Sequence, residues 1–207
     1  MPVETCPLQS AWVRYGWYNK TMKSWWNNLI DRGMNRVNGR WASLFSLVFL
    51  AFILWVLPAV SQWGESVGLT QSIDTSFGLS ADQLWTIAEG YGSSLRQAYL
   101  IQRWTFDLAF PLVYGGFLWV SGLYWMKRLK AGFGLKQTLV IIPLGVVFDY
   151  LENTLVSLVF VFYPQRILGL TELAVLMIPV KWFFVVGSML LVSGLAVGSI
   201  IRPWIKK

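Results

Sequence analysis

Two carboxylates and a carboxamide interrupt one long apolar run, at Asp149, Glu152 and Asn153. Residues three and four apart share one face of a helix, so these three side chains are expected to point the same way. Ionisable groups deep in a membrane are costly and usually face a bundle interior, a water-filled cavity or each other. A carboxyl group in such a place can carry a proton, or act as acid or base on an apolar substrate. The spacing therefore predicts a polar site inside a membrane-embedded helix.

Lys181 lies in a later apolar segment that would run in the opposite direction across the membrane. At about 1.5 Å per residue, Lys181 and Asp149 both fall near the middle of a hydrocarbon core about 30 Å thick. A pair between Lys181 and either Asp149 or Glu152 is expected, because each charge alone would be expensive there. The candidate polar centre is shared by three helices and consists of Asp107, Tyr114, Asp149, Glu152, Asn153 and Lys181.

This candidate centre has three carboxylates and one lysine, so its charges do not balance. Either a carboxyl is protonated at neutral pH, or water or a cation enters, or Arg96 or Arg103 folds inward.

Four interpretations of this centre stay open: a structural polar knot, proton-linked transport or relay, a membrane-embedded lipid-modifying enzyme, and a scaffold or accessory subunit. Transport predicts a water path to Glu152, and the enzyme predicts a lateral apolar pocket ending at Asp149 and Glu152. A scaffold predicts a dry, fully hydrogen-bonded knot.

Several kinds of site lack their parts. The chain has no histidine and one cysteine, Cys6, which excludes imidazole zinc sites, His-ligated haem, Ser-His-Asp nucleophiles and disulfides within the chain. There is no Gly-rich phosphate loop either. No cofactor and no metal are expected, and any metal site would have to use oxygen ligands suited to Mg²⁺, Ca²⁺ or Mn²⁺.

The elements that must position the polar centre are membrane-spanning helices. Of the 207 residues, 56% are hydrophobic and 13% charged, whereas soluble domains are about 25% charged. The fold class predicted is all-α: a polytopic membrane protein with four transmembrane helices, preceded by an interfacial N-terminal helix. The spans are expected at about 41–63, 104–126, 137–162 and 173–201. A short extracytoplasmic helix, capped by Ser80 and Gln83, is expected before the second span.

Residues 1–40 form a separate basic and aromatic arm before the transmembrane domain of residues 41–207. Apolar residues recur at helical spacing in this arm, at Met22, Trp25, Trp26, Leu29 and Ile30. This composition suits a helix in the headgroup region, with rings inward and cations at anionic lipid headgroups. An RNA-binding arm would also mix arginine with aromatic residues, but attachment to a membrane domain favours lipid, so no nucleic-acid partner is expected.

Basic residues also predict the orientation. The connection between the second and third spans carries four basic residues, Lys127, Arg128, Lys130 and Lys136, and no acid. The arm and the C-terminal tail are also basic, so the positive-inside rule places both termini and this connection in the cytoplasm. We therefore expect a multi-pass protein of the inner (plasma) membrane. Its partners are the lipid bilayer and, as alternatives that stay open, further copies of itself or a larger membrane complex.

Four short motifs follow one another along the chain: Arg96-x-x-Tyr99, Asp107-x-x-x-Pro111-x-x-Tyr114, Asp149-x-x-Glu152-Asn153 and Lys181-Trp182. In this order they resemble a group of uncharacterised bacterial four-helix membrane proteins. The resemblance covers about residues 79–185 and leaves the basic arm outside. No activity is known for that group, so the resemblance implies only that these polar residues form one set.

Overall fold

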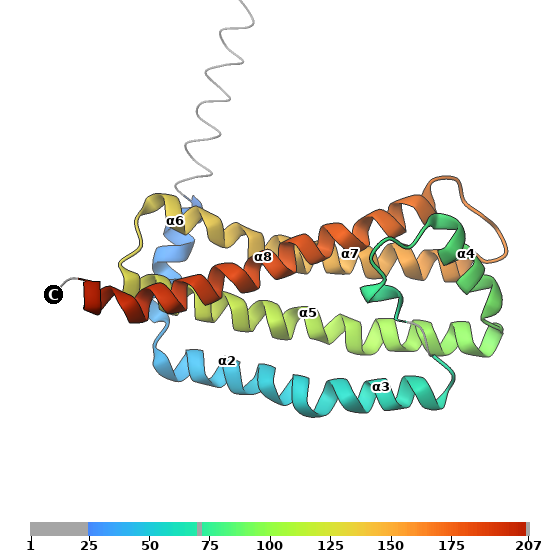
Figure 1. The fold of residues 1–207 in the computed structure, drawn as a ribbon, viewed down its shortest axis with the longest axis horizontal. Coiled ribbons are helices and arrows are strands. Elements are labelled where there is room, and N and C mark those ends of the chain that lie inside the picture. Colours follow the sequence, from blue (N-terminus) through green and yellow to red (C-terminus); the bar gives the residue numbers. More distant parts are fainter. Residues whose placement is uncertain (1–24, 70–71, 206–207) are drawn as a thin grey trace, which may run out of the picture.

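The computed structural model describes residues 25–69 and 72–205, and this part of the chain consists of helices joined by short connections, without strands. The predictions for Met22, Cys6 and the rest of residues 1–24 lie outside the described residues. Four helices, Gly39–Ser66, Ser93–Leu129, Phe133–Phe162 and Leu170–Trp204, are long and apolar enough to cross a membrane. They run side by side along the long axis of the molecule (Figure 1). The prediction of an all-α protein with four such helices is confirmed.

The first long helix consists of α2 (Gly39–Ala51), a π-helical turn (Phe52–Val56) and α3 (Leu57–Ser66). It starts where the Asn38 side chain accepts hydrogen bonds from the backbone N–H groups of Arg40 and Trp41. Pro58 lies near the start of α3, and the helix continues past it. Because proline lacks an N–H and its ring crowds the carbonyl of the residue four before, the wider π turn just ahead of Pro58 accommodates it.

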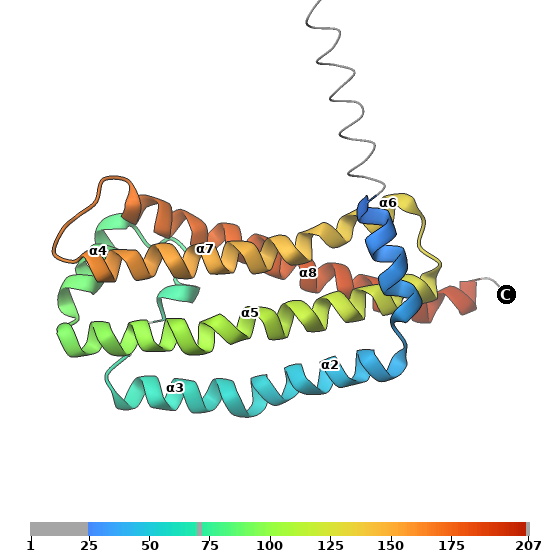
Figure 2. The same cartoon turned by 180° about the vertical axis from the view of Figure 1, so that it is seen from behind.

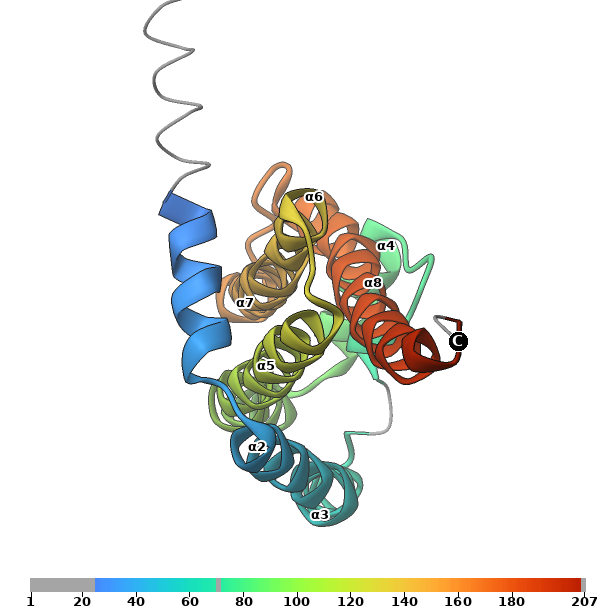
Figure 3. The same cartoon turned by 90° about the vertical axis from the view of Figure 1, so that its left-hand side faces the viewer.

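The other three long helices pack together as α5 (Ser93–Leu129), α7 (Ile141–Phe162) and α8 (Leu170–Ile205). Two short elements, α6 (Phe133–Gln137) and a 3₁₀ turn (Thr138–Val140), lead into α7. Two adjacent glycines on α5 permit close packing on two sides. A Cβ at Gly115 would lie 2.5 Å from Val146 on α7, and one at Gly116 would lie 2.9 Å from Phe45 on α2. α5 therefore lies between α2–α3 and the pair α7–α8 (Figure 3).

One end of the bundle carries α4 (Ala81–Gly90) and a 3₁₀ turn (Ile73–Thr75). Ser80 and Gln83 form the expected capping box at the start of α4, with bonds of 3.1 and 2.8 Å. α5 begins at Ser93, directly after the short break at Tyr91 and Gly92, and so includes the residues before the span expected from about residue 104. The 3₁₀ turn folds inward, and its Ile73 is buried against the bundle.

The opposite end carries a helix of residues 25–36, the connection through α6 and the C-terminal end of α8 (Figure 1). The helix of residues 25–36 runs across the long helices rather than along them (Figures 2 and 3). Three side chains of this helix contact the bundle. Ile30 is fully buried, Trp26 packs edge-on against Trp119, and Asp31 pairs with Lys136 at 2.6 Å. These contacts fix the helix crosswise at this end of the bundle.

Candidate functional site

Arg103, on α5, is one of two cations at the centre of a buried charge cluster, and it is only 4% exposed. Its Nη1 donates to Asn153 Oδ1 at 2.6 Å and lies 3.2 Å from Asp107 Oδ2, one helical turn further along α5. Its Nη2 lies 3.5 Å from Glu152 Oε1, and its Nε donates to the Tyr99 hydroxyl at 2.8 Å. The planar guanidinium thus joins α5 to α7 through several directed contacts.

Lys181, on α8, is the second cation and is 2% exposed. Its Nζ lies 3.0 Å from Glu152 Oε2 and 3.8 Å from Asp149 Oδ1, and it also pairs with Asp74. Asp74, Asp149 and Glu152 bring one carboxylate oxygen each within 4.8 Å of one another, a spacing that a hard metal ion would accept. Because the Lys181 ammonium contacts all three, a cation of the chain itself already lies among them.

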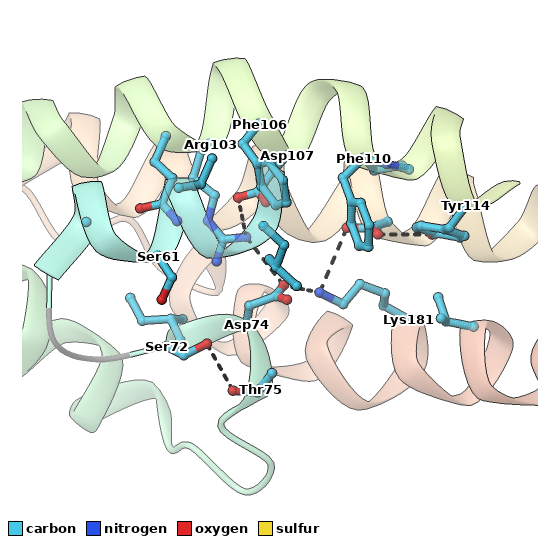
Figure 4. A pocket seen from close by; sticks show the side chains of 18 of the residues that line it. Ser61, Ser72, Asp74, Thr75, Arg103, Phe106, Asp107, Phe110, Tyr114 and Lys181 are labelled. Carbon is cyan, nitrogen blue, oxygen red and sulfur yellow. Dashed lines mark hydrogen bonds and ion pairs between the residues drawn. The ribbon is translucent and has the colours of Figure 1, made fainter. Parts of the chain in front are cut away.

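Asp74 comes from the 3₁₀ turn outside the spanning helices and reaches inward to both cations (Figure 4). Its backbone carbonyl accepts a hydrogen bond of 2.8 Å from Trp182 Nε1, which holds the turn against α8. Burial by itself would raise the pKa of Asp74, but Lys181 and Arg103 lower that pKa to about 2. Asp74 is therefore ionised at neutral pH.

Tyr114 and Asn153 orient the carboxylate of Asp149. The Tyr114 hydroxyl donates to Asp149 Oδ2 at 3.0 Å, and Asn153 Nδ2 donates to Asp149 Oδ1 at 3.3 Å. Asn153 Nδ2 also donates to the Asp107 carbonyl at 3.3 Å. That carbonyl is the one left without a helical partner by Pro111, four residues later, which has no N–H. The spacing of Asp107 and Pro111 therefore gives Asn153 an acceptor on α5.

A cavity of about 510 Å³ lies beside the cluster, between α2–α3 on one side and α5 and α8 on the others. Its wall on the first helix is mostly apolar, with Phe49, Ile53, Leu57 and Val60, and it also includes Ser61 and Glu65. Its charged side is formed by residues of the cluster, namely Asp74, Arg103, Asp107, Asp149 and Lys181. Figure 4 shows the charged side chains, with the rings of Phe106 and Phe110 beside them. The cavity thus has an apolar part and a charged part.

The structure brings all six residues of the predicted polar centre into this cluster: Asp107, Tyr114, Asp149, Glu152, Asn153 and Lys181. Lys181 was expected to pair with Asp149 or Glu152, and its ammonium lies 3.8 Å from the first and 3.0 Å from the second. Of the two arginines considered as inward partners, Arg103 enters the cluster. Arg96 instead donates to the carbonyls of Ala88 and Tyr91 at the end of α4.

The predicted polar centre left out Asp74 and Tyr99, although Tyr99 belongs to one of the four motifs. Asp74 lies in the connection between the first two long helices, and nothing in the neighbouring sequence indicates that this connection folds inward. Tyr99 lies four residues before Arg103, one helical turn away, and this spacing could have indicated their contact once Arg103 was placed inside.

No protein-family model matches this chain, and no curated protein or solved structure shows significant similarity to it. The comparisons therefore add no support to the resemblance noted from the motifs. What the chain does has to be argued from the cluster and its cavity.

Proposed function

We propose that this chain is a membrane protein that binds an amphiphilic molecule from the bilayer. The apolar tail of the ligand lies in the cavity between α2–α3 and α8, and its polar head contacts Asp107 and Asp149. The observation that carries the proposal is the 510 Å³ cavity with one apolar wall and one charged wall. Its volume is in the range of small-molecule sites, which are mostly apolar with a few convergent polar groups.

The tail side of the cavity is suited to entry from lipid. Leu57, on α3, and Met189, on α8, line the cavity from opposite sides, and each is more than a third exposed. Both lie on helices apolar enough to span a membrane, so a ligand dissolved in the bilayer would meet apolar side chains on its way in. We place the entrance between these two residues.

The head side offers two carboxylates within reach. The side chains of Asp107 and Asp149 line the cavity and are 18% and 12% exposed. Asp149, held by Tyr114 and close to Lys181, is the better placed of the two to exchange a proton with a bound head. The site therefore has the parts for acid–base chemistry on a ligand, and binding is the step that such chemistry would require first.

The other interpretations have less support. A relay through Glu152 needs water beside that carboxyl, but Glu152 is fully buried and is not among the residues that line the cavity. A purely structural knot needs no adjoining space, whereas this cluster borders a cavity large enough for a ligand. The lipid-modifying alternative requires a lateral apolar pocket ending at Asp149 and Glu152, and this cavity is lined by Asp149 but not by Glu152.

The test is saturable binding of dodecyl amphiphiles to the protein in nanodiscs, with binding to empty nanodiscs subtracted. A panel of dodecyltrimethylammonium, dodecanol and laurate covers the three charge types. Ser61→Phe places a ring in the cavity and is expected to abolish binding, whereas Leu54→Phe on the outer face of the same helix leaves it unchanged. Absence of saturable binding for every probe, or equal binding by both variants, would refute the proposal.

We also propose that the end of the bundle with the helix of residues 25–36 faces the cytoplasm of a bacterial inner membrane. Trp25 and Leu29 are exposed on this crosswise helix, and Arg32 and Arg36 are exposed beside them. Exposed rings and cations together suit the headgroup region and anionic lipids. The basic connection at Lys127–Lys136 lies at the same end (Figure 1), which supports this orientation.

A further inference from the structure

The charges around the cavity point to the class of the ligand head. The cluster contains four carboxylates, Asp74, Asp107, Asp149 and Glu152, and among the described residues two cations, Arg103 and Lys181. With every group ionised, the cluster carries two more negative than positive charges. In a place shielded from water, such an excess is relieved by protons or by a further cation.

The two cations already divide their contacts among the buried carboxylates. Lys181 is closest to Asp74 and Glu152, and it lies 3.8 Å from Asp149. Arg103 is the one ion-pair partner of Asp107 in the described part of the chain, and it contacts Asp74 and Glu152 as well. The negative charge left over is therefore concentrated at Asp107 on α5 and Asp149 on α7, both of which line the cavity.

Aromatic rings lie beside these two carboxylates. Phe106, Phe110 and Tyr114 line the cavity at successive turns of α5, and Trp182 lines it from α8. The rings of Phe110 and Tyr114 meet edge to face at 5.5 Å, and those of Phe106 and Phe110 stack at 5.3 Å. Ring faces attract alkylammonium groups, most strongly where water is excluded. Carboxylates with rings around them favour a cation, whereas an anionic head would meet an excess of negative charge.

We propose that the ligand is a cationic amphiphile, with an ammonium head between Asp107 and Asp149 and an alkyl or other apolar tail along Ile53, Leu57 and Val60. This inference rests on the proposed function, because it names the ligand class of the same cavity. The head supplies one of the two missing positive charges. The quaternary or protonated nitrogen would contact the carboxylates and the rings of Phe106 and Phe110.

The test compares the affinities of the three dodecyl probes for the protein in nanodiscs. Dodecyltrimethylammonium, whose charge does not depend on pH, is expected to bind at least about tenfold more tightly than dodecanol, a factor that corresponds to about 1.4 kcal/mol. Laurate is expected to show no saturable binding. Asp107→Asn is expected to remove most of the preference for the ammonium probe, whereas Asp82→Asn, an exposed acid on α4, leaves it unchanged.

The outcomes separate this inference from the proposed function. Dodecanol or laurate binding as tightly as the ammonium probe would overturn the cationic class while the cavity still binds amphiphiles. No saturable binding of any probe would overturn both. A retained tenfold preference in both Asp107→Asn and Asp149→Asn, with unfolding midpoints confirming that each variant is folded, would also overturn the assignment of these carboxylates.

Discussion

Replacing Lys181 with methionine tests whether the charge cluster stabilises the bundle. Lys181 is 2% exposed, and its ammonium contacts three carboxylates, of which Glu152 is fully buried. Methionine keeps a similar apolar stem but removes the charge, so Glu152 would keep Arg103 as its remaining cation, at 3.5 Å. Removing one partner of a buried ion pair costs about 3–5 kcal/mol, because it leaves an uncompensated charge in the interior. We expect Lys181→Met to lower the free energy of unfolding by about that amount.

The contribution of Glu152 can be separated by a double-mutant cycle. Glu152→Gln removes the fully buried carboxylate charge that loses its closer cation in Lys181→Met, so the double variant is expected to be more stable than the sum of the two losses predicts. The recovery is expected to be about 0.5–3 kcal/mol, the range for residues in direct contact. Part of the loss stays, because Asp149 and Asp74 have also lost the ammonium.

The assay is unfolding in mixed micelles with increasing dodecyl sulfate, followed by tryptophan fluorescence. Arg166→Met is the matched control, since Arg166 pairs with Asp82 at 2.5 Å but both side chains are largely exposed. An exposed pair contributes about 0–1 kcal/mol, so the control is expected to change stability little. Additive losses for Lys181→Met and Glu152→Gln, or a loss for Lys181→Met no larger than that of the control, would refute the reasoning.

Three further predictions concern the second cation, the inward turn and the orientation. Arg103→Gln is expected to destabilise the protein by about 3–5 kcal/mol. The Arg96 side chain bonds two carbonyls outside the cluster, so Arg96→Gln is expected to cost only about 1–2 kcal/mol. Equal losses in the same unfolding assay would count against a central role for Arg103. Because the pKa of Asp74 in the folded protein, about 2, lies below its ordinary value of 3.8, its contribution to stability is present above that ordinary value and is lost as the pH falls from about 4 to about 2. Unfolding measured across that window is expected to show a smaller pH dependence for Asp74→Asn than for the unchanged protein, and identical slopes would contradict the assignment. In a Cys6→Ser background, K130C and S76C are expected to react with a membrane-impermeant maleimide from opposite sides of sealed vesicles; labelling from one side for both would refute the proposed orientation.

The sequence by itself determined the helices and much of the cluster. Long apolar runs predict spanning helices because a chain in lipid must satisfy its own backbone hydrogen bonds. Helical periodicity places Asp149, Glu152 and Asn153 on one face, and the rise per residue brings Lys181 to the same depth. These are local rules, and they place Lys181 at the depth of Asp149 and Glu152 without deciding which of the two lies closer to it.

Only the tertiary structure decided which loop residue and which arginine complete the cluster. Asp74 reaches it because the Trp182 indole, 108 residues later in the chain, donates to the Asp74 carbonyl and holds the turn inward. Arg103 enters rather than Arg96 because α5 turns this residue toward Asn153 on α7. The cavity is lined by residues from α2–α3, α5, α7 and α8 together, so it forms only when these helices pack. Each of these features depends on how separate helices pack, which no local pattern of residues contains.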